Sequence, residues 1–404
     1  REYRDGTFVL VTTWTTPDGV AEVVEFMPVQ EDRTDVVRRV RAVRGEVRFR
    51  TEVRIRFGYA DALPWVRQRG TRTAPELAAA AGPDAVAVRG VRLHAVDHAH
   101  VAEFTVGDGE ARDLVLTWHP SWRDAPPPLD VDAAGAATEA WWRDWGAGLQ
   151  HEGPHHVAVI RSLLVLTALT HRDTGGIVAA ATTSLPEQFG GERNWDYRYV
   201  WLRDASLTLT ALLQHGFRDE ADRWRTWLLR AIAGDPEDVQ IMYGIAGERF
   251  LGERTIASLP GYGGAAPVRV GNGASTQYQA DVIGEVMVAL DAARRAGLAE
   301  TPSSWPLQRA LMAYTERHWR RPDSGIWEMR GPEQHFTQSR VMVWAAFDRA
   351  VQAVEEFGLD GPVDRWRRLR DEERHRHEPE TVLLGTPASE VLLLDAATME
   401  STSE

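Results

Sequence analysis

The repeat of apolar residues changes along this chain, and that change limits the folds it can adopt. In residues 47–57, Val, Phe, Thr or Ile alternates with Arg or Glu, the pattern of a half-buried β-strand with one face in water. Several such short runs, separated by turn residues, predict an antiparallel β-sandwich over residues 1–125. From about residue 155 the apolar residues recur at helical spacing, so a helical domain is expected to follow.

A tight turn is predicted at Gly107-Asp108-Gly109, because these residues separate two β-like runs, 103–106 and 114–118. We therefore expect those two runs to pair as a β-hairpin. The arginines of residues 47–57 could be taken for a nucleic-acid patch, but the neighbouring acidic residues favour a solvated sheet face.

Three consecutive prolines, Pro126 to Pro128, mark a domain boundary. A linker with a helix is predicted over residues 126–154, the helical domain over 155–376, and a tail over 377–404. The expected helices of the second domain lie near 155–171, 200–216, 219–233, 275–297, 304–319, 337–357 and 362–376.

Composition excludes several kinds of chemistry. The 404 residues contain no Cys and no Lys, which removes thiol nucleophiles, thiolate metal sites and lysine Schiff bases. A net charge of −13 disfavours nucleic acid and anionic membranes as partners. Because no apolar run is long enough to span a bilayer and no signal peptide is recognised, we expect a cytoplasmic protein.

No metal site is expected either. The His residues that could be considered as ligands lack a matching Cys or carboxylate spacing, so solvated imidazoles are the simpler interpretation. They are His151, His155, His156, His375 and His377.

The densest cluster of polar and aromatic residues lies at 194–204, where a long loop enters a helix. Aromatic rings, arginine forks and carboxylates are the groups that bind sugars, and Arg203 and Asp204 could hold vicinal hydroxyls. An alternative of equal weight is a structural ion pair at a helix N-terminus.

A second candidate segment, 323–331, forms a loop between two expected helices and contains Glu328 directly after Trp327. A carboxyl group held against an indole in a dry pocket has a raised pKa, which suits a general acid. A surface Glu in a turn would be the better explanation if this dipeptide stood alone.

Taken together, these segments resemble one family. The runs YVWLRDASLTLTALL at 199–213 and SGIWEMRG at 324–331 are similar to the inverting glycoside hydrolases of family 15, the glucoamylase and trehalase type. Three further stretches resemble bacterial members of that family: 175–199, 259–274 and 335–350. The similarity runs in order from about residue 3 to about residue 373.

The resemblance implies an N-terminal β-sandwich, a linker and an (α/α)6 barrel, here incomplete with about seven of its twelve helices. It implies hydrolysis of terminal α-glucosidic bonds with inversion and without a cofactor, on an oligosaccharide or disaccharide. Glu328 matches the general acid. The residues that match the sugar-binding subsite are Arg203, Asp204, Trp201, Tyr197 and Trp327.

The match fails near both ends, and the family's general base is not recognisable. Glu380 and Glu390 lie in the dissimilar tail, and neither is assigned as the base. We therefore expect a truncated chain that hydrolyses poorly, and an inactive sugar-binding remnant is the alternative function. A helical-barrel polysaccharide lyase is disfavoured by the ordered family match, whereas trehalose and maltooligosaccharides both stay open as substrates.

Overall fold

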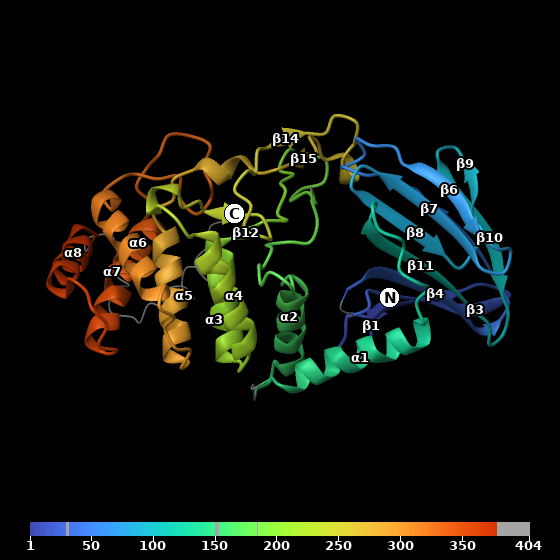
Figure 1. Cartoon of the computed structure of the whole chain (residues 1–404), viewed down its shortest axis with the longest axis horizontal. Coiled ribbons are helices and arrows are strands. Elements are labelled where there is room, and N and C mark those ends of the chain that lie inside the picture. The colour runs from blue at the N-terminus through green and yellow to red at the C-terminus, as the bar shows by residue number, and fades with distance from the viewer. Residues whose placement is uncertain (30–31, 150–152, 184, 378–404) are drawn as a thin grey trace. The chain divides into compact units, whose positions relative to one another are not determined.

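The computed structural model describes residues 1–29, 32–149, 153–183 and 185–377 (Figure 1). They fall into two compact units, Arg1–Leu164 and the residues that follow from Val165. The first unit contains β-sheets and the second is mainly helical. The expected combination of an antiparallel sheet with a run of helices is thus confirmed.

The first unit holds an eight-stranded sheet in the order β1-β2-β3-β4-β11-β8-β7-β6 and a three-stranded sheet in the order β5-β10-β9. Neighbouring strands within both sheets are antiparallel. The strands are β1 Glu2–Tyr3, β2 Leu10–Thr15, β3 Gly19–Phe26, β4 Thr34–Gly45, β5 Val47–Val53, β6 Trp65–Gly70, β7 Pro75–Ala81, β8 Asp84–Arg89, β9 His94–Val96, β10 Ala99–Val106 and β11 Ala111–Pro120.

Apolar side chains of β4 point alternately to the two faces of the larger sheet and pack in two different clusters. Val40 and Ala42 pack with Val47 and Val106 of the smaller sheet. Val37 points to the opposite face, into a cluster that also includes residues of β2, β3 and α1 (Val131–Ala147). Because successive side chains of a strand point to opposite faces, the two-residue period recognised in the sequence produces this layering.

The hairpin predicted at residues 107–109 is wrong. β10 pairs with β5 and β9, whereas β11 pairs with β4 and β8 in the larger sheet. The tight turn itself is present, with Glu110 N donating to Gly107 O at 2.8 Å. Its role is to carry the chain from one sheet to the other, which turn residues alone do not reveal.

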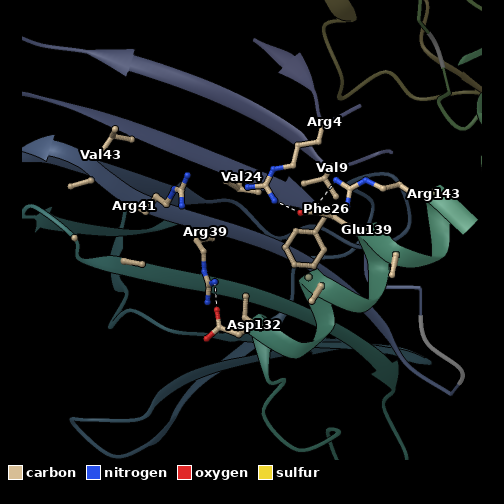
Figure 2. Close-up of a pocket in the computed structure, with 17 residues that line it drawn as sticks. Arg4, Val9, Val24, Phe26, Arg39, Arg41, Val43, Asp132, Glu139 and Arg143 are labelled. Carbon is tan, nitrogen blue, oxygen red and sulfur yellow. Dashed lines mark hydrogen bonds and ion pairs between the residues drawn. The ribbon is translucent and has the colours of Figure 1, made fainter. Parts of the chain in front are cut away.

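A groove of about 810 Å³ lies between α1 and the larger sheet (Figure 2). Arg39 of β4 reaches across it, bonded to Asp113 of β11 through Nε at 2.6 Å and also paired with Asp132 of α1. Arg4 pairs with Glu139 further along α1. These ion pairs join the helix to the sheet at both ends of the groove.

After α1 the chain forms helices that agree with the helical spacing of the sequence, and all but the first of them lie wholly in the second unit. The helices that follow α1 are α2 His156–Ala168, α3 Leu202–Gln214, α4 Arg218–Ala231, α5 Val282–Arg295, α6 Ser304–His318, α7 Thr337–Glu355 and α8 Val363–His377. Helix α5 packs between α3 and α7. It begins at Val282 instead of the expected residue 275, because Gly273–Thr276 forms a 3₁₀ turn capped by Asn272.

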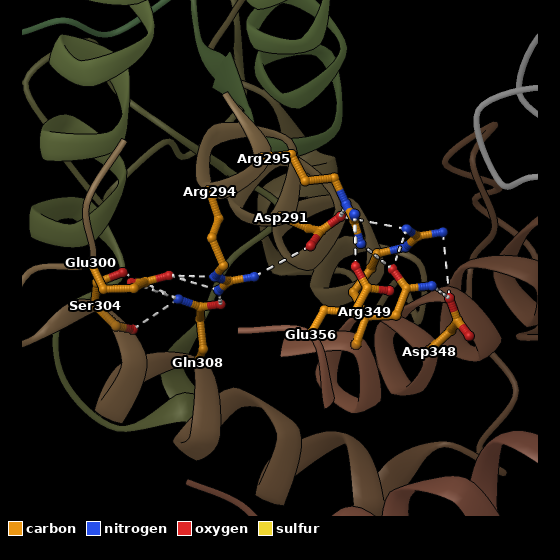
Figure 3. A network of polar contacts seen from close by, with 10 residues as sticks. Asp291, Arg294, Arg295, Glu300, Ser304, Gln308, Asp348, Arg349 and Glu356 are labelled. Atoms are coloured by element: carbon orange, nitrogen blue, oxygen red, sulfur yellow. Dashed lines mark hydrogen bonds and ion pairs between the residues drawn. The ribbon is translucent and has the colours of Figure 1, made fainter. Parts of the chain in front are cut away.

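Polar residues of α5, α6 and α7 form an extended network at one end of these helices (Figure 3). At its centre the buried carboxylate of Asp291 accepts from Arg295 Nε at 2.8 Å and from Arg294 and Arg349 at 3.4 Å. Since the three cations come from two helices, this one carboxylate couples α5 to α7.

Replacing Asp291 should therefore be costly. We expect Asp291→Ala to lower the free energy of unfolding by about 1–3 kcal/mol, because three arginines lose a buried charged acceptor although each keeps a second carboxylate partner. Asp360→Ala is the control: its carboxylate pairs with Arg309 but is 88% exposed, so a change of about 0–1 kcal/mol is expected. Urea denaturation of both variants measures the difference, and equal effects would contradict the role of the network.

Candidate active site

The segment 194–204 is held from both sides where it enters α3. Its last extended residues, Val200–Trp201, form β12 and pair with β13, Met242–Tyr243. Leu202 N then donates to Ile241 O at 3.0 Å. Because Trp201 is the N-cap residue of α3, its neighbours Arg203 and Asp204 lie in the first helical turn with fixed backbone positions.

The loop that carries Glu328 adopts a strained backbone. Glu328 has φ +54°, in the left-handed region that non-glycine residues rarely enter, at a cost of about 1–3 kcal/mol. Glu328 N donates to Gly325 O and Met329 N donates to Ser324 O, both at 3.0 Å. Gln277 Nε2 also donates to Glu328 O at 3.2 Å. These bonds hold the strained residue in one orientation.

The two segments meet, although they are far apart in sequence. Trp201 Nε1 donates to Glu328 Oε1 at 2.5 Å. The guanidinium group of Arg203 lies 3.0 Å from the carboxylate of Asp204 and 4.0 Å from that of Glu328, and it donates to Ile326 O at 3.5 Å. The ion pair considered for the helix N-terminus is present, and the same arginine also faces Glu328.

Burial dominates the electrostatics of Glu328, whose side chain is 21% exposed. Loss of solvation raises the pKa of Glu328, while the Trp201 hydrogen bond and the charge of Arg203 lower it. The carboxyl groups of Asp204 and Asp281 raise this pKa further. The outcome is a carboxyl group that keeps its proton at a higher pH than an exposed glutamate.

The aromatic candidates differ in their surroundings. The ring of Tyr197 lies 5.8 Å from that of Trp201, and burial raises the pKa of the tyrosine to about 12. Tyr197 therefore stays a neutral hydroxyl at physiological pH. Trp327 is 66% exposed, so its indole offers an open face next to Glu328.

A second cluster fixes the residues that follow Glu328. Arg330 pairs with Glu253 at 2.7 Å, and Glu253 also lies 3.6 Å from Arg269. The guanidinium groups of Arg330 and Arg269 each lie 4.5 Å from the ring of Trp195. Three loops are thereby joined around one indole, and the Glu328 loop is one of them.

Sequence reasoning missed several groups of this region. Gln277, which supports the Glu328 backbone, was expected to be helical, and the carboxyl groups of Asp281 and Glu285 were assigned no role. A signal for the last two was available: they stand one turn apart in a segment, 281–293, that is otherwise largely apolar. A carboxyl on the buried face of a helix calls for a partner or a function.

Two negative findings apply to the described residues. Within 1–29, 32–149, 153–183 and 185–377, no group of three or more His, Asp or Glu side chains is arranged to hold a metal ion. In the same part of the chain, the helices are too short or too polar to traverse a lipid bilayer. His151, Glu380 and Glu390 lie outside the described residues.

Comparison with known proteins identifies the family of this chain. Residues 153–378, more than half of the chain, match the profile of glycosyl hydrolases family 15. The chain belongs to this family.

Several relatives are known as trehalases. The chain is 40% identical over 263 residues to the trehalase of Mycobacterium tuberculosis, covering 62% of this chain and 38% of that protein. It is 38% identical over 235 residues to the trehalase of Thermoplasma volcanium, and this match covers 58% of this chain and 37% of that protein. Trehalase 1 of Sulfolobus acidocaldarius is 29% identical over 354 residues, covering 84% and 59%. The chain thus spans less than two thirds of the length of these relatives.

The bond between Trp201 and Glu328 can be tested directly. A hydrogen bond to a carboxylate stabilises the ionised form, so Trp201→Phe should raise the pKa of Glu328 further. The titration of the Glu328 carboxyl ¹³C signal, assigned by its loss in Glu328→Gln, measures this pKa. Trp327→Phe, the same change at the adjacent exposed residue, should leave it nearly unchanged. An unshifted pKa in Trp201→Phe would rule out the bond in solution.

Proposed function

We propose that this protein hydrolyses a terminal α-glucosidic bond with inversion, and that trehalose is its substrate. The observation that carries the proposal is the contact of Glu328 with Trp201 and Arg203, which places a carboxylic acid of raised pKa beside a fork of hydrogen-bond donors. The choice of trehalose is supported by the relatives, since those described above are named trehalases. Maltooligosaccharides are the second substrate class.

The proposed architecture follows the family. Residues 1–125 form the β-sandwich domain, 126–154 the linker and 155–376 the catalytic domain. Helices α3 to α8 are part of an (α/α)6 barrel in this proposal. Packing of α5 between α3 and α7 supports it, because the inner helices of such a barrel have neighbours on both sides.

Glu328 acts as the general acid. Its proton passes to the glycosidic oxygen as the bond from that oxygen to the anomeric carbon breaks, which stabilises the leaving glucose. Arg203 donates to hydroxyl groups of the terminal glucose, and Asp204 accepts from them. Tyr197 and Trp327 line the sugar with aromatic and hydroxyl groups, whereas Trp201, which is 2% exposed, acts through its hydrogen bond to Glu328. No cofactor takes part.

Inversion also needs a base that takes a proton from the attacking water on the opposite face of the sugar. The two carboxyl groups that raise the pKa of Glu328 are poorly suited to that task. Asp204 is paired with Arg203 at 3.0 Å, and Asp281 is 0% exposed and so out of reach of the sugar. The base is therefore left unassigned, and a chain that binds sugar without hydrolysing it is the alternative function.

Product analysis tests the reaction and separates the alternatives. Two proteins should each be assayed on trehalose, maltose and isomaltose. One is the 404-residue chain, and the other is a longer chain that contains it and is as long as the trehalases described above. Inverting hydrolysis of trehalose releases one α-glucose and one β-glucose at first, whereas retention releases only α-glucose. We expect equal anomers from the longer chain and little turnover by the shorter one. Robust turnover by the shorter chain would place a base within it.

Removing the proton donor should abolish most activity. Glu328→Gln keeps the shape and the acceptor oxygen, so we expect kcat to fall by about 10²–10⁴-fold with little change in stability. Glu333→Gln is the matched control in the same loop, because its partly exposed carboxylate pairs with Arg321. Steady-state kinetics of the longer chain on trehalose measures the loss, and a Glu328→Gln variant with more than a tenth of its activity would exclude the acid role.

Arg203 should stabilise the transition state of hydrolysis in the longer chain. Arg203→Ala leaves sugar hydroxyls and Asp204 without their donor, so kcat/KM is expected to fall by at least about 100-fold, equivalent to about 3 kcal/mol. Arg203→Lys keeps the charge but loses the fork, and an intermediate loss is expected. Unchanged turnover in Arg203→Ala would contradict the sugar-binding role.

A further inference from the structure

Two carboxyl groups that the proposed mechanism leaves without a role lie next to the site. Asp281 directly precedes α5 and Glu285 stands one turn further on. Their exposures are 0% and 2%, so neither can contact solvent or substrate directly. Both are close enough to Arg203 for their charge to raise the pKa of that guanidinium group.

One amide bridges the pair. Gln338 of α7 donates through Nε2 to Asp281 Oδ2 at 3.3 Å and to Glu285 Oε1 at 3.4 Å. Two acceptors of this cluster, Gln338 Oε1 and Asp281 Oδ1, are buried and have no donor among the described residues. A carboxyl group that carries a proton is a donor, so one proton on the pair would satisfy an acceptor that is otherwise orphaned.

The charges around Asp281 and Glu285 also favour one proton on this pair. The charged and titratable groups that face the pair are Arg203 and Asp204 of α3, Asp323, and Glu328. With every carboxyl group ionised, Arg203 would face the four negative charges of Asp204, Asp281, Glu285 and Glu328. Burial raises the pKa of both members, that of Glu285 to about 8, and Arg203 opposes the shift.

We propose that Asp281 and Glu285 share a single proton at neutral pH, and that the one negative charge left on the pair positions Arg203 for the sugar. The pair acts through Arg203, so both are positioning residues. The second half of the proposal rests on the proposed function, whereas the shared proton does not.

The shared charge predicts an unusual pattern of substitutions. In Asp281→Asn or Glu285→Gln, the remaining carboxyl group has lost its like-charged neighbour and ionises, so one negative charge still faces Arg203. In the longer chain described above, we expect each single variant to lower kcat/KM on trehalose by at most about fivefold. The double variant has no charge at this place, and a loss of about 100-fold or more is expected, because residues of one network are not additive.

Stability gives a readout that does not depend on hydrolysis. Glu285 has a higher pKa in the folded chain than its ordinary 4.5, so the stability it contributes is present below about pH 4.5 and is lost as the pH rises to about 8. Thermal unfolding midpoints of the 404-residue chain should therefore fall less between pH 5 and 8 in Glu285→Gln than in the wild type. Asp281→Asn should show the same flattening.

Glu373→Gln is the matched control. Its carboxyl group is also buried, with a pKa raised to about 7, but it lies beside Arg340 in another part of the unit. The change in unfolding midpoint caused by Glu373→Gln should add to the change caused by Asp281→Asn at every pH. Equal slopes in the wild type and both single variants, or additive losses in the double variant, would overturn the shared proton. If the slopes change as expected but no sugar is hydrolysed, the pair stands and the proposed function fails.

Discussion

A single mostly buried cation governs the arrangement of the helical unit at this site. Arg203 lies within ion-pair range of Asp204 and Glu328, and its pKa is raised by the charges of Asp281 and Glu285 as well. Four carboxyl groups can approach one another in a poorly solvated region only if a cation and protons offset their repulsion. The positions of α3, α5 and the Glu328 loop are therefore linked through one guanidinium group.

The backbone of Glu328 is strained, and neighbouring residues keep it in this conformation. A residue at φ +54° would relax if its backbone were free. Gln277 binds the carbonyl of Glu328, and the pair of Arg330 with Glu253 anchors the chain two residues later. Support on both sides of the strained residue keeps the carboxyl group against Trp201, so residues of other loops set the orientation of this carboxyl group.

The spacing of apolar residues predicts the helices and strands, but it does not predict which distant segments pair with one another. The helices and β5, Val47–Val53, follow from apolar spacing, because spacing decides which face can be buried. The expected strand of residues 47–57 is shorter than its alternating pattern. The turn at 107–109 was recognised, but its partner strands were not, since a turn does not specify the sheet it leads to. Arg203 and Glu328 stood out within unusual motifs. Asp281 and Glu285 did not, because acidic residues in a helix ordinarily face water.

The larger sheet has a consequence for the order in which this protein can be assembled. β11 lies between β4 and β8, yet it is the last strand of that sheet to leave the ribosome. Until residues 111–120 emerge, β4 and β8 each lack the strand that pairs with one of their edges in the folded sheet. Unpaired edges recruit other strands, so the nascent chain passes through a stage at which aggregation competes with folding. Arrival of β11 ends that stage by pairing both edges at once.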